Sequence, residues 1–133
     1  MKPAGYSGTP LPKKLGIKPE SRALLVGAPR DVVAELGVTA NNAKRDQLDF
    51  VLMFVKTAAE LKKNFGALAV KLQPAGMLWV GWPKKTSGVV SDLTEDVVRR
   101  IGLDAGLVDV KVCAIDETWS GLKFVYRLKD RPK

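Results

Sequence analysis

Continuous apolar runs alternate with amphipathic segments along this chain, which is the order of elements expected in a parallel α/β sheet. Residues 22–27 and 48–55 each form a short apolar run, and the second run is interrupted only by Asp49. A run that is apolar on both alternating faces is typical of a central strand covered on both sides. Residues 77–82 form a third such run, which ends at Pro83. We expect each of the three runs to be a buried strand.

Amphipathic segments separate these runs. Residues 57–72 place apolar side chains at steps of three and four, and Thr57 with Glu60 forms a capping-box pattern at the start of this predicted helix. Between the first two strands, Asp31 is expected to cap a shorter helix that ends at Leu36. A strand, a helix and a second strand in this order form the parallel crossover unit.

The last third of the chain combines one more helix with a change of period. Residues 92–106 predict an amphipathic helix, with Asp92 or Thr94 as its N-cap. Residues 107–115 then alternate between apolar and polar side chains, and residues 122–128 do so less regularly. The connection between these two segments is short enough only for an antiparallel hairpin.

Together these elements predict a single three-layer αβα domain over residues 22–128. Its sheet is expected to be mostly parallel, with about five strands and an antiparallel C-terminal hairpin. Residues 1–21 are expected to form a basic N-terminal arm that packs on this domain, and residues 129–133 a basic tail.

Composition narrows the classes of function. The chain has 22 Lys and Arg against 14 Asp and Glu, a net charge of +8, no histidine and one cysteine, Cys113. Without histidine, the commonest general base and zinc ligand are missing, and one cysteine cannot form an internal disulfide. Because we find no leader-like segment and no apolar run long enough to cross a bilayer, we expect a cytoplasmic protein with no membrane partner. The oligomeric state stays open.

Ligands of open parallel sheets bind at the carboxyl ends of the strands, and four predicted loops meet there. The loop at 84–88 offers two ammonium groups and two hydroxyls, which suit phosphate or carboxylate oxygens, although it lacks the spacing of a P-loop. The segment at 116–120 adds two carboxylates, two hydroxyls and an indole. The candidate ligand-binding residues are Trp82, Lys84, Lys85, Thr86, Ser87, Asp116, Glu117, Thr118, Trp119 and Ser120.

Each of these candidates also has a purely structural interpretation. Lysine pairs in loops are usually just solvated, and a tryptophan at a strand end such as Trp82 is more often buried than exposed in a pocket. Asp116 and Ser120 could bond backbone amides in a turn while Trp119 covers the edge of the core. Cys113 has no basic neighbour of the kind that activates a thiolate, so we expect it to be inert. We assign no catalytic residue and no metal ligand.

Three phrases of the chain resemble a bacterial domain-of-unknown-function family, family 3052. They are AGYSGTPLPKKLGIK (4–18), WPKKTSGVVSDLTEDVVR (82–99) and VDVKVCAIDETWSGLKFV (108–125). This resemblance brings no established activity. The strand 48–55, the phrase LQPAGMLWV and the closing hairpin also resemble the second half of the class I methyltransferase fold. In that fold the final strand inserts antiparallel, and a glycine-rich turn after the first strand helps to hold S-adenosylmethionine.

The chain departs from the methyltransferase pattern at the elements that hold this cofactor. The turn after the first strand keeps one glycine, Gly27, and Pro29 removes a backbone donor. Too few residues lie between 22–27 and 48–55 for two more strands and their crossovers, so we expect the second and third strands of the family to be missing. We therefore expect this chain to be a truncated, degenerate domain of this type that binds no cofactor and no S-adenosylmethionine.

Three functions stay open on these grounds. The one we favour is a binding module, rather than an enzyme, that receives an anionic small molecule or a protein partner at the carboxyl edge of the sheet. The second is a small enzyme with Asp116 or Glu117 as acid or base and with Lys84 and Lys85 as an anion clamp. The third is nonspecific nucleic-acid binding through the basic termini. The C-terminal basic residues are Lys123, Arg127, Lys129, Arg131 and Lys133.

Overall fold

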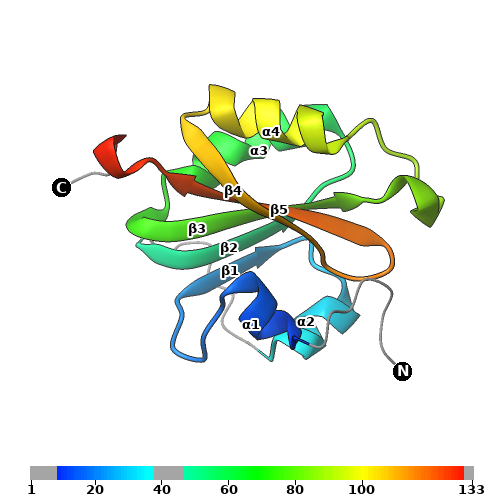
Figure 1. The fold of residues 1–133 in the computed structure, drawn as a ribbon, viewed down its shortest axis with the longest axis horizontal. Helices are drawn as coiled ribbons and strands as arrows, with labels where there is room; N and C mark the ends of the chain where they lie inside the picture. The colour runs from blue at the N-terminus through cyan, green and yellow to red at the C-terminus, as the bar shows by residue number, and fades with distance from the viewer. Residues whose placement is uncertain (1–8, 38–46, 131–133) are drawn as a thin grey trace.

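The computed structural model describes residues 9–37 and 47–130, which form one sheet between two layers of helices (Figure 1). The strands are β1 (Ala23–Val26), β2 (Leu48–Phe54), β3 (Leu72–Pro83), β4 (Leu107–Ala114) and β5 (Trp119–Tyr126). The α-helices are α1 (Leu11–Leu15), α2 (Arg30–Leu36), α3 (Ala58–Ala69) and α4 (Glu95–Asp104), and the short 3₁₀ helices are η1 (Lys85–Ser87) and η2 (Leu128–Asp130).

The sheet has the order β1-β2-β3-β5-β4. Strands β1, β2 and β3 pair in parallel, whereas β5 pairs antiparallel with both β3 and β4. The predicted αβα architecture with an antiparallel C-terminal hairpin is therefore confirmed. The antiparallel strand β5 lies inside the sheet. Among the described residues, β1 and β4 are the two edge strands of the sheet.

Each face of the sheet has its own hydrophobic core, because successive side chains of a buried strand point to opposite faces. Helices α3 and α4 cover one face, where Phe65 of α3 packs edge-on against Phe124 of β5 with ring centroids 5.2 Å apart. Helices α1 and α2 cover the other face, where Trp79 is fully buried as predicted. The indole Nε1–H of Trp79 donates a hydrogen bond to the Leu15 carbonyl at 2.8 Å. This bond joins α1 to the sheet.

Two helix starts follow the predicted chemistry. The Thr57 hydroxyl accepts from the Glu60 N–H at 3.1 Å, and the Thr94 hydroxyl accepts from the Val97 N–H at 3.2 Å. These bonds satisfy backbone donors that have no partner within the helix. The expectation for α2 was wrong by two residues, because Pro29 rather than Asp31 occupies the N-cap and Asp31 lies in the first turn.

The boundary between α3 and β3 differs from the prediction. The helix ends at Ala69, and Leu72, expected as its last inward residue, begins the strand instead. The Leu48 N–H donates to the Lys71 carbonyl at 2.8 Å, and Leu72 pairs with Leu48. Pairing with β2 therefore decides the start of β3, a contact that the local apolar pattern does not contain.

The expected regular alternation along β4 is also wrong. A β-bulge between Asp109 and Lys111 leaves Val110 without an opposite residue. Asp109 lies opposite Phe124 and Lys111 opposite Lys123, so the two β4 side chains point to opposite faces of the sheet. Asp109 consequently reaches α4, where its carboxylate accepts from Arg99 Nε at 2.8 Å.

Some predictions fall outside the described residues. Residues 1–8 of the basic arm, most of the polar stretch before β2 and the last three residues of the tail are among them. The described part of the arm packs on the sheet through Leu11, Leu15 and Ile17, which are all buried. None of the helices within 9–37 and 47–130 has the length and apolar character needed to span a membrane.

Candidate functional site

The loop after β3 and the loop between β4 and β5 meet at the carboxyl edge of the sheet. The Lys84 N–H donates to the Thr118 carbonyl at 2.8 Å. Next to it, Trp82 pairs with Ser120 and Pro83 with Trp119, because β5 begins at Trp119 rather than at the expected residue 122. The structure therefore brings together the two segments that contain all the predicted ligand-binding residues.

The side chains of these two segments face two separate hollows on opposite faces of the sheet. A cavity of about 280 Å³ lies on the face covered by α1 and α2. It is lined by Leu11, Asp31, Val32, Glu35, Ile115, Asp116, Glu117 and Thr118. A second hollow lies beside α4 on the other face. It is lined by Trp82, Pro83, Lys84, Lys85, Leu93, Thr94, Glu95, Asp96 and Ser120.

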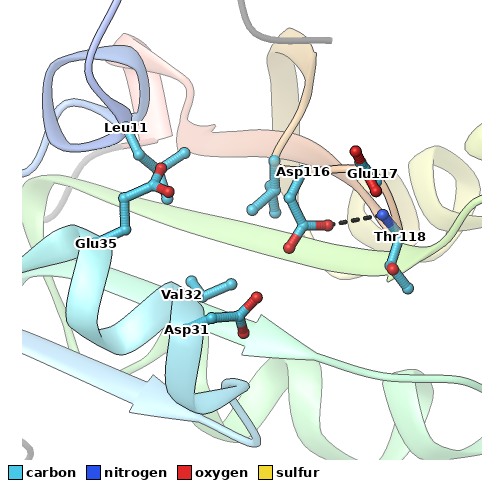
Figure 2. Close-up of a pocket in the computed structure, with 8 residues that line it drawn as sticks. Leu11, Asp31, Val32, Glu35, Asp116, Glu117 and Thr118 are labelled. Atoms are coloured by element: carbon cyan, nitrogen blue, oxygen red, sulfur yellow. Dashed lines mark hydrogen bonds between the residues drawn. The ribbon is translucent and has the colours of Figure 1, made fainter. Parts of the chain in front are cut away.

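The cavity beside α1 and α2 is acidic. Asp31 and Glu35 project from successive turns of α2, and Asp116 and Glu117 belong to the β4–β5 loop. Figure 2 shows Asp31 and Asp116 on opposite walls with their carboxylates toward the space between them. Its lining contains no basic side chain. Such a cavity favours a ligand that carries positive charge or offers hydrogen-bond donors.

Asp116 and Trp119 have structural roles in the hairpin turn. One Asp116 carboxylate oxygen, Oδ1, accepts from the N–H groups of Thr118 at 2.8 Å and Trp119 at 2.9 Å, as Figure 2 shows for Thr118. The Trp119 ring packs edge-on against Phe54 with centroids 4.9 Å apart. The other Asp116 oxygen, Oδ2, accepts no hydrogen bond from a described residue and is available to a ligand.

The hollow beside α4 carries both signs of charge. Glu95 and Asp96 both pair with Arg99 on the next turn of α4. Hydrogen bonds to Asp109 and Glu95 raise the pKa of the Arg99 guanidinium. Lys84 and Lys85, in contrast, form no ion pair with a described carboxylate. No ion pair therefore holds their ammonium groups against the acidic side chains that line the same hollow.

Three other predicted residues around this hollow are less open to a ligand. The Ser87 hydroxyl donates to the Lys84 carbonyl at 2.6 Å and accepts from the Val89 N–H at 3.1 Å, so it holds its own loop together. Trp82 is only 5% exposed. Thr86 is exposed but lines neither hollow.

Cys113 has one basic neighbour on its own strand, Lys111, and a second, Lys14, from α1. Lys14 of α1 reaches across to the Ala114 carbonyl, to which its Nζ donates at 2.6 Å. Desolvation raises the pKa of the half-buried Cys113 thiol, and the charges of Lys14 and Lys111 only partly oppose this effect. Basic groups therefore lie near the thiol, but they do not activate it, and the raised pKa agrees with the expected inert role.

Residues that the sequence interpretation did not single out complete both hollows. Asp31 and Glu35 are four residues apart, a spacing that places two carboxylates on one face of a helix, and this was the available signal. Leu11 joins the cavity only through the packing of α1. Across residues 9–37 and 47–130, no group of three or more His, Cys, Asp or Glu side chains is placed to hold a metal ion.

The turn after β1 tests how well the chain fits an adenosyl cofactor. Gly27 has a φ of 68°, and a Cβ there would come within 3.2 Å of the Phe54 carbonyl oxygen, so packing against β2 already requires glycine. Pro29, at the N-cap of α2, has no N–H to donate. The groups suited to an adenosyl cofactor are instead the carboxylates of the acidic cavity. They can accept hydrogen bonds from ribose hydroxyls and attract the positively charged groups of the cofactor.

Comparison with known proteins identifies the fold. Neither a protein-family model nor a curated protein sequence matches the chain, so the resemblance to family 3052 stays a prediction. A SAM-dependent methyltransferase from Aquifex aeolicus is similar, with a TM-score of 0.60 and 17% identity over 84% of this chain and 85% of that one. Magnesium protoporphyrin IX methyltransferase from Synechocystis PCC 6803 with bound SAM has a TM-score of 0.56 and 12% identity, over 82% and 71% of the two chains. Aeropyrum pernix fibrillarin with bound S-adenosyl-L-methionine has a TM-score of 0.53 and 15% identity, over 91% and 70%.

These neighbours correct one expectation. We expected no cofactor and no S-adenosylmethionine binding, because the chain is short and the turn after β1 keeps one glycine. Two of the three neighbours hold S-adenosylmethionine, and the Aquifex methyltransferase matches over nearly equal shares of both chains. A short sheet is therefore no ground for excluding this cofactor, and carboxylates from other loops offer it partners that a count of glycines overlooks. The chain has the methyltransferase-like Rossmann fold.

Proposed function

We propose that this chain is a ligand-binding domain of the methyltransferase type, and that its acidic cavity holds S-adenosylmethionine or a related adenosyl compound. One observation carries the proposal: Asp31, Glu35, Asp116 and Glu117 wall a cavity at the carboxyl edge of the sheet, the edge at which ligands of open α/β sheets bind. The shared fold with proteins solved with bound S-adenosylmethionine supports the choice of ligand.

The chemistry of the cavity suits this ligand. S-adenosylmethionine carries a positive sulfonium, a positive ammonium group and two ribose hydroxyls, all of which carboxylates attract or accept from. Leu11, Val32 and Ile115 add apolar surface for the adenine ring. When bound, the compound supplies an electrophilic methyl group. The α2 carboxylates on one wall and Asp116 on the other would hold it from two sides.

Removing two of these carboxylates should weaken binding. The double variant Asp31→Asn, Glu35→Gln keeps the side-chain shapes and removes two negative charges from α2. We expect its affinity for S-adenosylmethionine to fall about tenfold, because each removed charge lowers the attraction to a cation in a partly enclosed site. S-adenosylhomocysteine has no sulfonium charge, so its affinity should fall less. Titration calorimetry with both compounds measures the difference.

The matched control is Glu20→Gln, Asp104→Asn, which removes the same charge at two exposed positions outside the cavity lining. This control should bind like the wild type. Absence of any heat with wild-type protein and S-adenosylmethionine would refute the proposal. Equal affinity of the α2 double variant and the wild type would refute it as well.

A second candidate function is the binding of an anionic small molecule at Lys84 and Lys85. The observation that favours it is that both lysines line this hollow and neither forms an ion pair with a described carboxylate. Ammonium groups bind phosphate oxygens through charge-assisted hydrogen bonds. The enzyme alternative, with Asp116 or Glu117 as acid or base, needs these carboxylates beside the lysines, whereas they line separate hollows.

The variant Lys84→Gln, Lys85→Gln tests this second function with pyrophosphate and AMP as probes. If the lysines form the site, affinity for both probes should fall about tenfold or more, because two charge-assisted contacts are lost. Lys62→Gln, Lys63→Gln is the control, since both residues are exposed on α3 and carry the same charge. Equal weakening in both variants, or no binding by the wild type, would exclude this function.

A further inference from the structure

Three lysines gather on one face of the β4–β5 hairpin. Lys111 of β4 lies directly opposite Lys123 of β5, and directly opposite residues of an antiparallel pair point to the same face. Lys123 also lies opposite Trp79, which places this pair on the face covered by α1. Lys14 of α1 completes the group, since the Lys111 Nζ donates to its carbonyl at 3.0 Å. We call Lys14, Lys111 and Lys123 the hairpin lysine cluster.

No carboxylate of the neighbouring strand positions faces this cluster. The strand register assigns Met77, Val108, Cys113, Gly121 and Val125 to the same face, and none of these is acidic. Neither Lys111 nor Lys123 forms an ion pair with a described carboxylate. Like charges directly opposite each other destabilise a sheet. The free protein therefore carries a repulsion that a bound anion would relieve.

The positive charge extends beyond the space of one phosphate group. Arg127 and Lys129 are exposed just past the end of β5. Four residues of extended chain span about 13 Å, so Arg127 lies well beyond the reach of a phosphate held at Lys123. A row of cations of this length matches a linear polyanion better than a single phosphate.

Two further observations indicate which kind of polyanion, a lipid surface or a nucleic acid, fits this face. The large apolar side chains that are exposed on the hairpin are Val110, in the bulge, and Val112, which pairs with Leu122 of the opposite core. This face therefore presents no such side chain for insertion into a lipid surface. The aromatic side chains of the hairpin are not placed for stacking on bases at this cluster, because Trp79 is fully buried, Trp119 packs edge-on against Phe54 and Tyr126 belongs to the opposite core.

We propose that the hairpin lysine cluster binds the phosphate backbone of a nucleic acid without regard to base sequence. The binding is electrostatic, through lysine contacts that release counterions from the backbone. This site lies on the same face of the sheet as the acidic cavity, but none of the three cluster lysines lines that cavity. The ligand proposal can thus fail without affecting this one.

The test is fluorescence anisotropy with labelled single-stranded oligonucleotides of about 20 nucleotides in two unrelated sequences, titrated between about 50 and 200 mM salt. The wild type should bind both sequences with similar affinity that falls with salt. Lys111→Gln, Lys123→Gln should weaken binding about tenfold at low salt and reduce the logarithmic salt slope by about two. Lys123→Gln alone, whose side chain forms no hydrogen bond with a described residue, should give about half of this effect and leaves the Lys111 contact to α1 intact.

The control is again Lys62→Gln, Lys63→Gln on α3, behind the opposite face of the sheet, and it should lose less than about twofold. Equal loss in the control and the cluster variants would mean that net charge alone attracts the oligonucleotide, and would overturn the proposal. So would a wild type that does not bind at low salt. Displacement of the oligonucleotide by inorganic phosphate at constant ionic strength, or tighter binding to phosphatidylserine vesicles than to the oligonucleotides, would also overturn it.

Discussion

Gly102→Ala should destabilise the protein by about 3 kcal/mol, because the added methyl group has no space. Gly102 lies in α4 where the helix packs on β5, and a Cβ there would overlap the ring of Phe124. Phe124 cannot yield, since it is fully buried and packed edge-on against Phe65. Helix and strand would have to separate. Chemical denaturation of the wild type and the variant measures the loss in the free energy of unfolding.

The matched control is Gly66→Ala in α3. A Cβ at Gly66 would meet nothing within 4 Å. There the same substitution should stabilise the protein by up to about 1 kcal/mol, because alanine favours the helix over glycine. The opposite signs of the two changes separate packing from helix propensity. If Gly102→Ala proved as stable as the wild type, the close approach of α4 to β5 would be wrong.

Trp79→Phe should cost about 2–4 kcal/mol through a smaller side chain and a buried carbonyl without its donor. The indole N–H of Trp79 is the donor to the Leu15 carbonyl, and both residues are buried. The loss should be strongest at α1, which this bond joins to the sheet. Because Leu11 of α1 lines the acidic cavity, ligand affinity should fall as well.

Amide hydrogen exchange locates this effect. The N–H groups of Lys14, Gly16 and Ile17, which donate within α1 and its C-terminal turn, should lose protection more than the central amides of β2. Uniform loss of protection in both regions would mean that the bond stabilises the whole domain rather than α1. Unchanged protection and unchanged stability together would show that the bond contributes nothing.

Local chemistry was sufficient to predict most elements of the sheet and two helix starts. Strand β2 is apolar on both faces because both faces are covered, and this pattern needs no knowledge of the partners. Thr57 and Thr94 cap α3 and α4 through bonds to residues three positions away. Such short-range contacts are present in the sequence itself.

Elements defined by pairing were predicted less well. Leu72 continues the helical period of α3, yet it joins β3 because Leu48 lies beside it. Val110 continues the alternation of β4, yet it lies in a bulge. In both cases the strand register, set by pairing with residues distant in sequence, overrides the local pattern.

For the candidate site, the sequence by itself determined that the loops after β3 and β4 lie at one edge of the sheet, because strand direction follows from the order of elements. Only the tertiary structure decided that Asp116 and Lys84 serve different hollows, since the sheet separates their side chains. It alone added Asp31 and Glu35 to the acidic cavity and placed Lys14 beside Lys111 and Lys123. These groupings depend on strand register and helix packing, which join residues far apart along the chain and leave no local pattern in the sequence.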